Sequence, residues 1–323
     1  MRKLEREGRY WGDLGMIREI RTGSLIEQRV WDDITGRELD WGGVVAARAE
    51  EMVEFTKHGV YEKVPIEECI AKTGKKPLKV RWVDINKGDD VTPEYRSRLV
   101  AKEIKIDKRW DLFAATPPLE AKKMLFSMAV TEGIGYVEGK RKEGMKLDFI
   151  DVRRAYFHAD AIREVYVELC DEDWEEGMCG RLVKSMYGTR DAAFNWETAY
   201  SEFMEEGGFK RGRASPCVFH HPERNIKGVI HGDDFTMLGY EKDLDWFRKH
   251  MEERFEIKLK ASLGLEEKDD KYVRILNRVV EWDQEGITYE ADQRHAEIII
   301  REMGLSGSKK GLSVPCSREG KDN

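Results

Sequence analysis

The spacing of apolar and polar residues along the chain predicts an alternation of helices and hairpins. Apolar side chains recur at helical spacing over 43–58, 117–133, 244–255 and 294–304, and 180–209 is also rich in helical pattern. Short strands joined by tight turns are predicted over 78–104, 214–239 and 271–293. This order predicts an α+β fold in which helices gather on one side of an antiparallel sheet.

Two of the predicted helices come with an expected buried face. In 43–58 the face consists of Val45, Ala49, Met52 and Phe55. In 117–133 it consists of Leu119, Lys123, Met124, Phe126 and Val130. The second helix begins at a proline pair, which suits a first turn, and is expected to run for about four turns.

The segment 145–152 reads as a strand with a definite phase. Met145, Leu147 and Phe149 alternate on one face, and the same alternation places Asp151 with them. Asp148 is therefore expected on the opposite face, away from any site that Asp151 forms.

The length of 323 residues predicts either one large domain with lobes or two domains. No run of about 18 apolar residues is present, and the first residues lack the apolar stretch of a signal peptide. We therefore expect an intracellular protein with no membrane partner.

Cysteine and histidine spacing gives no sign of a metal or redox site. The five cysteines form no CxxC pair, and the seven histidines form no HExxH motif. The net charge is −7, yet residues 72–108 hold eleven Lys or Arg against six Asp or Glu. That local excess indicates either a solvated face or a surface for a nucleic acid.

Adjacent aspartates stand at 233 and 234, after a glycine and between two apolar runs. A hairpin turn would hold both carboxylates rigidly, and a third carboxylate from Asp151 would complete a site for a hard cation such as Mg²⁺. The alternative is an exposed turn without chemistry. A second pair, Asp32 and Asp33, lies among polar residues and is expected in a loop.

Five blocks together resemble one protein family. They are "EYRSRLVAKEI", "LDFIDVRRAYFHADAIREVYVEL", "GRLVKSMYGTRDAAFNW", "ASPCVFHH" and "VIHGDDFTMLG". Their order and spacing are similar to those of the reverse transcriptases of copia-type LTR retrotransposons, which are part of a Pol polyprotein. The resemblance runs from about Val60 to the last predicted helix.

The resemblance implies a catalytic centre of Asp151, Asp233 and Asp234. Asp151, Asp233 and the carbonyl of Val152 would bind two Mg²⁺ ions, for which Mn²⁺ is an alternative. Tyr156 would lie under the incoming sugar and favour deoxynucleotides; the alternative for it is a core tyrosine.

Further residues are similar to nucleotide-binding and primer-binding positions of the family. Arg98, with Arg96 and Lys102, would grip the triphosphate; the alternative is an exposed basic strand. Two blocks depart from the family pattern. Arg190 and Asp191 stand where "KQ" is usual, and Asp191 there would repel a triphosphate unless metal or Arg190 offsets it. His231 and Gly232 stand where "YV" is usual, at the primer end.

The resemblance also implies an arrangement of subdomains in a right-hand polymerase. Residues 1–59 would form an N-terminal extension with one helix, 60–119 and 159–195 the fingers, 120–158 and 196–292 the palm, and 293–323 a short or truncated thumb or connection. The expected partners are an RNA or DNA template with its primer and a dNTP, and a homodimer is compatible with the family.

The leading function is RNA-directed DNA polymerase, a nucleotidyltransferase. One alternative is a catalytically inactive retrotransposon remnant that binds nucleic acid or protein, suggested by the altered motif residues. The other is an RNA-templated RNA polymerase, suggested by "GDD" alone and opposed by Tyr156.

Overall fold

The computed structural model describes residues 29–307, except 90, 105–108, 292 and 306. Residues 1–28 of the predicted N-terminal extension and part of the predicted thumb therefore lie outside the described residues. The chain divides into two compact units. Unit 1 comprises residues 1–115 and 154–203, and unit 2 comprises 116–153 and 204–323. The predicted helix of the N-terminal extension belongs to unit 1, together with residues 60–115 and 159–195 of the predicted fingers, whereas residues 116–119 belong to unit 2.

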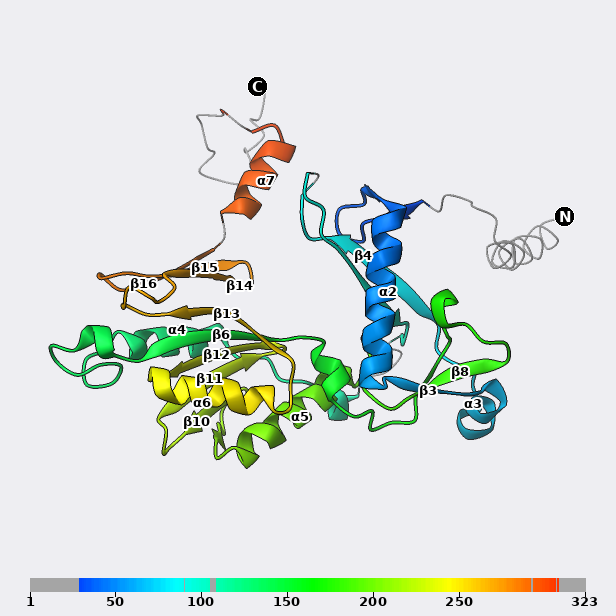
Figure 1. Ribbon diagram of the computed structural model, residues 1–323, viewed down its shortest axis with the longest axis horizontal. Helices are drawn as coiled ribbons and strands as arrows, with labels where there is room; N and C mark the ends of the chain where they lie inside the picture. Colours follow the sequence, from blue (N-terminus) through cyan, green and yellow to red (C-terminus); the bar gives the residue numbers. More distant parts are fainter. Residues whose placement is uncertain (1–28, 90, 105–108, 292, 306, 308–323) are drawn as a thin grey trace, which may run out of the picture. The chain divides into compact units, whose positions relative to one another are not determined.

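Unit 1 consists of small antiparallel sheets and two helices (Figure 1). Its strands are β1 (Val30–Trp31), β2 (Glu38–Leu39), β3 (Tyr61–Pro65), β4 (Val80–Asn86), β5 (Tyr95–Ala101), β7 (Tyr166–Val167) and β8 (Met178–Leu182). Its helices are α2 (Trp41–His58) and α3 (Ile66–Thr73), with the short 3₁₀ turns η1 (Trp110–Leu112), η3 (Ala155–His158) and η4 (Asp171–Asp173). The β4–β5 pair is the hairpin that the sequence predicts over 78–104.

Helix α2 is fixed at both ends by its caps. The Asp40 carboxylate accepts from the N–H of Gly43 at 2.7 Å, which satisfies a donor that the first turn leaves free. Gly59 ends the helix in the left-handed conformation, at φ 58°. Between them Phe55 packs edge-on against Phe157 of η3, with ring centroids 4.8 Å apart. This contact ties α2 into the core of unit 1.

Unit 2 is built on a six-stranded antiparallel sheet in the order β13-β6-β12-β11-β10-β9. These strands are β6 (Lys146–Val152), β9 (Lys210–Arg211), β10 (Val218–His221), β11 (Ile226–His231), β12 (Asp234–Gly239) and β13 (Ile257–Leu263). A second sheet holds β14 (Tyr272–Ile275), β15 (Arg278–Trp282) and β16 (Ile287–Ala291). The helices are α4 (Leu119–Ala129), α6 (Glu241–Glu252) and α7 (Arg294–Glu302), with the 3₁₀ turn η2 (Arg141–Glu143). Helix α5 (Ala192–Glu206) carries the chain from unit 1 into unit 2.

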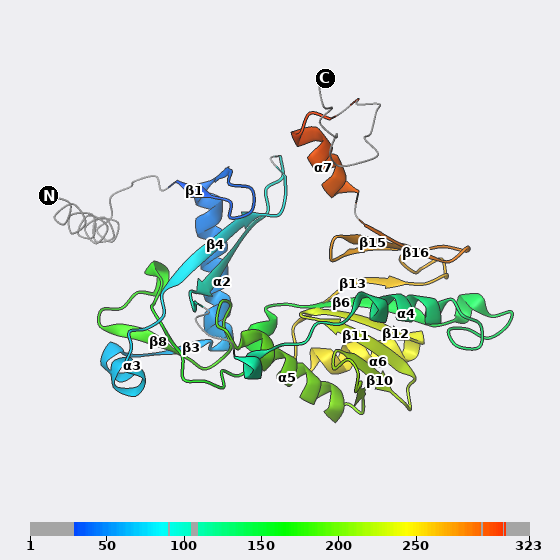
Figure 2. The same ribbon diagram turned by 180° about the vertical axis from the view of Figure 1, so that it is seen from behind.

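The six-stranded sheet is covered on both faces. On one face, Leu147 and Phe149 of β6 share a core with Leu125 of α4 and Val280 of the second sheet. On the other face, α6 packs against the sheet, and its Arg248 reaches Asp148. Figure 2 shows α4 and α6 running along the strands of this sheet. The α+β class is confirmed, but the expectation that the helices gather on one side is wrong, because α4 and α6 lie on opposite faces.

Two expected helix faces need correction because charged residues take core positions. In α4 the buried residues are Lys122, Leu125, Phe126 and Ala129, whereas Leu119 and Met124 are exposed. In α2, Val45 and Ala49 are exposed, and Val44 and Glu51 are buried with Phe55. The α4 helix also spans about three turns rather than four, since its eleven residues end at Ala129.

The strands predicted in unit 2 are present, and the structure also has strands that were not predicted, among them β13 in unit 2 and β8 in unit 1. The segments β10, β11 and β12 form the predicted hairpins, and β15 and β16 form the one closed by "DQEG". The phase of β6 is as predicted, with Asp148 and Asp151 on opposite faces. Strand β13 was not predicted, although "IKLKASL" alternates apolar and polar residues, and β8 occupies the start of a segment expected to be helical. None of the helices among the described residues is long and apolar enough to cross a membrane.

Candidate active site

The turn between β11 and β12 contains two residues, Gly232 and Asp233. His231 and Asp234 face each other as the last pair of the hairpin. Gly232 has a φ of 65°, a backbone conformation that residues other than glycine rarely adopt. A Cβ atom added to Gly232 would have no described atom within 4 Å. A positive φ at the first turn residue, filled by glycine, is typical of a type II′ hairpin. Gly232 therefore suits the backbone of this turn, which fixes where both aspartates stand.

The sheet brings Asp151 and Asp234 side by side. They are directly opposite each other in the β6–β12 register, and the N–H of Val152 donates to the carbonyl of Asp233 at 2.9 Å. Residues paired in this way project their side chains to the same face of a sheet. Of the residues predicted for the metal site, Asp151, Val152, Asp233 and Asp234 thus lie together at one end of β6 and β12.

A lysine from the neighbouring strand lies between these carboxylates. The Nζ atom of Lys260 is 2.8 Å from Asp151 Oδ1 and 2.7 Å from Asp234 Oδ1. The three side chains are 16–30% exposed, so the ion pairs are partly shielded from solvent. One ammonium thus bridges two of the three predicted catalytic carboxylates.

A β-bulge directs Lys260 to this position. The pairing of β13 with β6 shifts register between Leu259 and Ala261, so Lys260 is the residue left over on the bulged strand. Bulges bend a strand locally and re-aim the side chain at the irregularity. The position of the Lys260 ammonium is therefore built into the sheet.

The charges of the site perturb one another. The pKa of Asp233 is raised because its carboxyl group is shielded from water and because Asp234 and Asp151 carry like charges nearby. The residue as a whole is nevertheless exposed. Burial alone would lower the pKa of Lys260, but its hydrogen bonds to Asp151 and Asp234 raise it. Lys260 therefore stays protonated at neutral pH, and crowding of the acids disfavours a third negative charge.

Helix α4 adds a second lysine to this neighbourhood. Lys122 is 2% exposed, and its ammonium nitrogen has no hydrogen-bond partner among the described residues. Burial lowers its pKa, and the charge of Asp234 opposes that shift. Burial together with the charge of Lys122 also lowers the pKa of the half-buried His231. A buried, unpaired amine thus lies within electrostatic reach of Asp234.

Asp148 takes no part in this site. Its carboxylate is fully buried on the opposite face of the sheet and pairs with Arg248 of α6. Burial raises its pKa, and Arg248 counteracts that shift. Its role is to connect β6 to α6.

The donor set of the site fits a divalent cation. Carboxylate oxygens from two strands converge on one positive charge, and oxygen is the ligand atom that Mg²⁺ and Mn²⁺ prefer. Asp151, Asp233, Asp234 and the Val152 carbonyl are the residues that would hold such an ion.

In unit 1, the predicted nucleotide-binding residues Arg98 and Tyr156 meet at Tyr187. The Tyr156 and Tyr187 rings have centroids 4.9 Å apart, and the Arg98 guanidinium lies 4.7 Å from the Tyr187 centroid. Burial and the charge of Arg98 lower the pKa of Arg96, the next residue but one on β5. The structure thus gathers Arg96, Arg98 and Tyr156 around Tyr187, which the sequence did not single out.

The same cluster is anchored by acids of α2. Arg154 donates to the buried Glu51 at 3.2 Å, and its φ of 49° lies in the left-handed region, which is uncommon for a residue other than glycine. Burial raises the pKa of Glu51, whereas the charges of Arg154, Arg98 and Arg96 lower it. Glu51 is therefore the internal counter-charge of three arginines.

Asp191 and Arg190 belong to a network of hydrogen bonds and ion pairs within unit 1. Asp191 is buried and accepts from Arg163 at 2.7 Å and from the side-chain amide of Asn195 at 3.2 Å. Arg163 also holds Glu103, which accepts the N–H of Arg190 at 2.8 Å. The charge that offsets Asp191 thus comes from Arg163. Lys102 lies beside this network, directly after β5, and is exposed.

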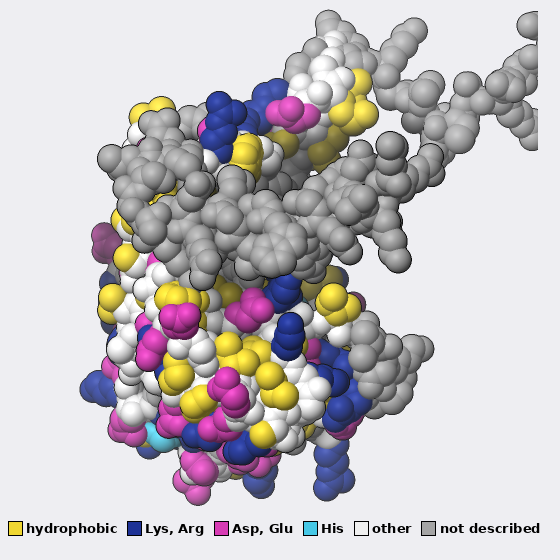
Figure 3. Space-filling view, turned by 90° about the vertical axis from the view of Figure 1, so that its right-hand side faces the viewer, with side chains coloured by type: hydrophobic (Ala, Val, Ile, Leu, Met, Phe, Trp, Pro, Cys, Tyr) yellow, Lys and Arg dark blue, Asp and Glu magenta, His cyan; other side chains and the backbone are white. Residues whose placement is uncertain are grey.

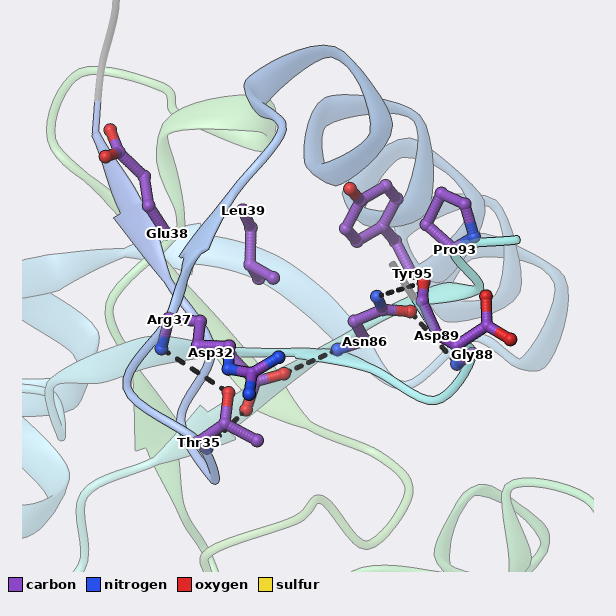
Figure 4. Close-up of a pocket in the computed structure, with 10 residues that line it drawn as sticks. All are labelled: Asp32, Thr35, Arg37, Glu38, Leu39, Asn86, Gly88, Asp89, Pro93 and Tyr95. Carbon is purple, nitrogen blue, oxygen red and sulfur yellow. Dashed lines mark hydrogen bonds between the residues drawn. The ribbon is translucent and has the colours of Figure 1, made fainter. Parts of the chain in front are cut away.

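A pocket of about 310 Å³ in unit 1 lies between the β1–β2 turn and the β4–β5 hairpin (Figure 4). As predicted, Asp32 is in a loop, where its carboxylate accepts three backbone N–H groups, from Ile34, Thr35 and Asn86. The Asn86 side chain in turn binds backbone groups of its own hairpin. These polar groups are used in shaping the loops, so we assign the pocket no ligand.

The face of the molecule shown in Figure 3 has no large patch of a single charge among the described residues. In Figure 3, Asp and Glu side chains are interspersed with Lys and Arg, and hydrophobic side chains are scattered among them. Specific clusters, such as that around Arg98, are therefore more informative than the overall basic character of 72–108.

Lys260 and Lys122 are the site residues that sequence reasoning missed. The alternation in "IKLKASL" could have placed Lys260 on a strand. Its contact with Asp151 and Asp234 depends on the bulge, which the alternation does not reveal.

Comparison with known proteins agrees with the resemblance in sequence. Residues 69–276 match the family model described as reverse transcriptase (RNA-dependent DNA polymerase). The chain is 28% identical over 213 residues to the Retrovirus-related Pol polyprotein from transposon TNT 1-94 of Nicotiana tabacum, covering 62% of this chain and 15% of that protein. It is 25% identical over 176 residues to the Truncated transposon Ty1-A Gag-Pol polyprotein of Saccharomyces cerevisiae, covering 53% and 14%.

Among solved structures, the chain has weak similarity to a foamy viral protease-reverse transcriptase in complex with double-stranded DNA. The two share 11% identity at a TM-score of 0.40, covering 80% of this chain and 37% of that one. The chain spans only 15% and 14% of the two curated relatives. Since the family model matches well over half of the chain, this protein belongs to the reverse transcriptase family and contains the reverse transcriptase domain of a copia-type retrotransposon.

Proposed function

We propose that this chain catalyses RNA-directed DNA synthesis. In this reaction the primer 3′-hydroxyl oxygen bonds to the α-phosphorus of a dNTP, the bond to the β-phosphate oxygen breaks, and pyrophosphate leaves. The observation that carries the proposal is the convergence of Asp151 and Asp234 on one positive charge at the end of β6 and β12. Membership of the family supports the same reaction.

The proposed roles follow from what each side chain can do. Asp151, Asp233 and the Val152 carbonyl would hold the metal, and Asp234 would complete the negative field. When bound, two Mg²⁺ ions, or Mn²⁺, would activate the primer hydroxyl and stabilise charge on the leaving pyrophosphate. The rigid two-residue turn at Gly232 keeps the carboxylates in position without reorganisation.

Substrate recognition is assigned to the Tyr187 cluster. Arg98 and Arg96 would bind triphosphate oxygens, because the guanidinium fork matches phosphate geometry. Tyr156, held by its ring contact with Tyr187, would select against a 2′-hydroxyl. The template–primer would bind through its phosphates, so that affinity falls steeply with salt.

The second candidate is a catalytically inactive remnant that binds nucleic acid or protein. One observation favours it: the Lys260 ammonium already neutralises Asp151 and Asp234. A remnant would bind a template–primer and incorporate nothing in the presence of metal.

Primer extension on an RNA template separates these candidates. Wild type should incorporate dNTP, Asp233→Asn and Asp151→Asn should lose at least about a thousandfold in rate, and Asp160→Asn, whose side chain is 81% exposed, should match wild type. Equal incorporation by wild type and Asp233→Asn would rule the polymerase out. Binding without incorporation by wild type would select the remnant, and efficient rNTP incorporation would select an RNA polymerase.

We also propose that the protein works inside the cell, in a cytoplasmic particle or the nucleus. RNA templates and deoxynucleoside triphosphates are found there. Fractionation of cells that express the tagged polyprotein tests this, and recovery in the medium alone would contradict it.

A further inference from the structure

Lys260 and a divalent cation compete for the same oxygen atoms. The ammonium lies at hydrogen-bond distance from both Asp151 Oδ1 and Asp234 Oδ1. A metal ion needs these oxygens about 2.0–2.2 Å from its centre, closer than the ammonium. The space between the two oxygens therefore holds one cation, either the ammonium or the metal.

The charge balance leads to the same conclusion. Asp151, Asp233 and Asp234 supply three negative charges, and Lys260 removes one of them. Lys122 adds a second amine, which is buried, unpaired among the described residues and within the field of Asp234. The two lysines therefore reduce the net negative charge that the three carboxylates offer to a metal ion.

The bulge argues against an accidental surface contact. A lysine on a regular strand could swing into solvent at little cost, but here the irregularity of β13 directs the side chain at the carboxylates. Lys249 of α6, on the opposite face of the sheet, is exposed and provides a comparison away from the carboxylates.

We propose that Lys260 is an internal counter-ion that occupies the carboxylate site in the absence of metal and must be displaced before a divalent cation binds Asp151. The inference rests on the proposed function, since it takes Asp151 as a metal ligand. It implies that metal binding to the protein without nucleic acid is weak, and that Lys260 sets this affinity.

Manganese binding to the full chain, without nucleotide or nucleic acid, tests the proposal. Free Mn²⁺ is measured by electron paramagnetic resonance during titration of the protein. We expect Lys260→Met and Lys260→Gln to bind Mn²⁺ at least tenfold more tightly than wild type. Lys260→Arg and Lys249→Met should stay within threefold of wild type. Equal affinity of wild type and both neutral Lys260 variants overturns the proposal.

A second measurement needs no variant. Acetylation of lysines in the wild type, read by mass spectrometry, reports how available each amine is. Saturating Mn²⁺ should raise acetylation of Lys260 at least threefold relative to Lys249, and an unchanged ratio overturns the proposal.

Asp151→Asn distinguishes the two levels of the hypothesis. If this variant binds Mn²⁺ as tightly as wild type, the proposed metal site itself is wrong. If it loses Mn²⁺ while Lys260→Met gains nothing, the metal site stands and only the role of Lys260 fails.

Discussion

Arg163 and Asp191 form an ion pair of 2.7 Å that closes a network between the end of β5 and the start of α5. Burial alone would raise the pKa of the Asp191 carboxyl group, but hydrogen bonds from Arg163 and Asn195 hold it below its ordinary value. The same guanidinium also binds Glu103. One arginine thus neutralises two shielded carboxylates.

We therefore expect Arg163→Met to destabilise the protein by about 3 kcal/mol or more at pH 7. Both shielded carboxylates would lose their counter-charge, although they would keep the hydrogen bonds from the Asn195 amide and the N–H of Arg190. Urea denaturation measures the change. Arg81→Met is the control: its ion pair with Asp33 is more exposed than that of Arg163 with Asp191, so its loss should cost less than about 1 kcal/mol. Equal, small costs for both variants would show that the network is not structural.

Gly232 and Gly36 have nearly the same backbone conformation, with φ of 65° and 67°, and open space around each. Alanine at either position should cost about 1–2 kcal/mol, because L residues disfavour this conformation. Only Gly232→Ala should also slow primer extension, since its turn positions Asp233 and Asp234. If Gly232→Ala were as stable as wild type, the turn would not require glycine.

Much of the sheet that bears the site could be predicted from sequence. The alternation in β6 and the apolar runs around the Gly232 turn are local signals. The alternation in β6 predicted the correct faces for Asp151 and Asp148. These signals work because one face of each strand is buried, so that a shift of one residue would expose the core.

The rest of the site depends on contacts between distant segments. Lys260 reaches Asp151 through a bulge whose register is set by pairing across about a hundred residues. Asp191 was placed beside a triphosphate by the family resemblance, and no local signal in the sequence indicated its ion pair with Arg163. The faces of α2 and α4 were misjudged because Glu51 and Lys122 occupy buried positions, which periodicity of apolar residues does not predict.

Lys122 offers a test of a buried charge. Its ammonium has no hydrogen-bond partner among the described residues, so its burial costs stability. Lys122→Met keeps the shape of the stem and should stabilise the protein by about 1–2 kcal/mol. Lys123→Met, at the exposed neighbouring position, should change the unfolding free energy by less than about 0.5 kcal/mol. A clear loss of stability in Lys122→Met would mean that its attraction to Asp234 outweighs its burial.

The pair of Asp148 and Arg248 predicts a pH-dependent effect. Burial raises the pKa of Asp148 in the folded protein above its pKa in the unfolded chain. As pH rises between these two pKa values, the unfolded chain loses the Asp148 proton while the folded protein keeps it, so the free energy of unfolding falls. Arg248 limits this fall by stabilising the carboxylate. Arg248→Met removes the attraction and raises the pKa of Asp148 further.

The variant should therefore be about 3 kcal/mol less stable than wild type at pH 7. The difference should nearly vanish near pH 3.5, where Asp148 is largely protonated in both states. Urea denaturation at several pH values measures it, and Lys249→Met, on the exposed side of α6, is the control. A stability difference that does not change with pH would mean that Arg248 acts by packing of its aliphatic stem, because packing involves no titrating group. The compensation of the Asp148 charge would then contribute nothing measurable.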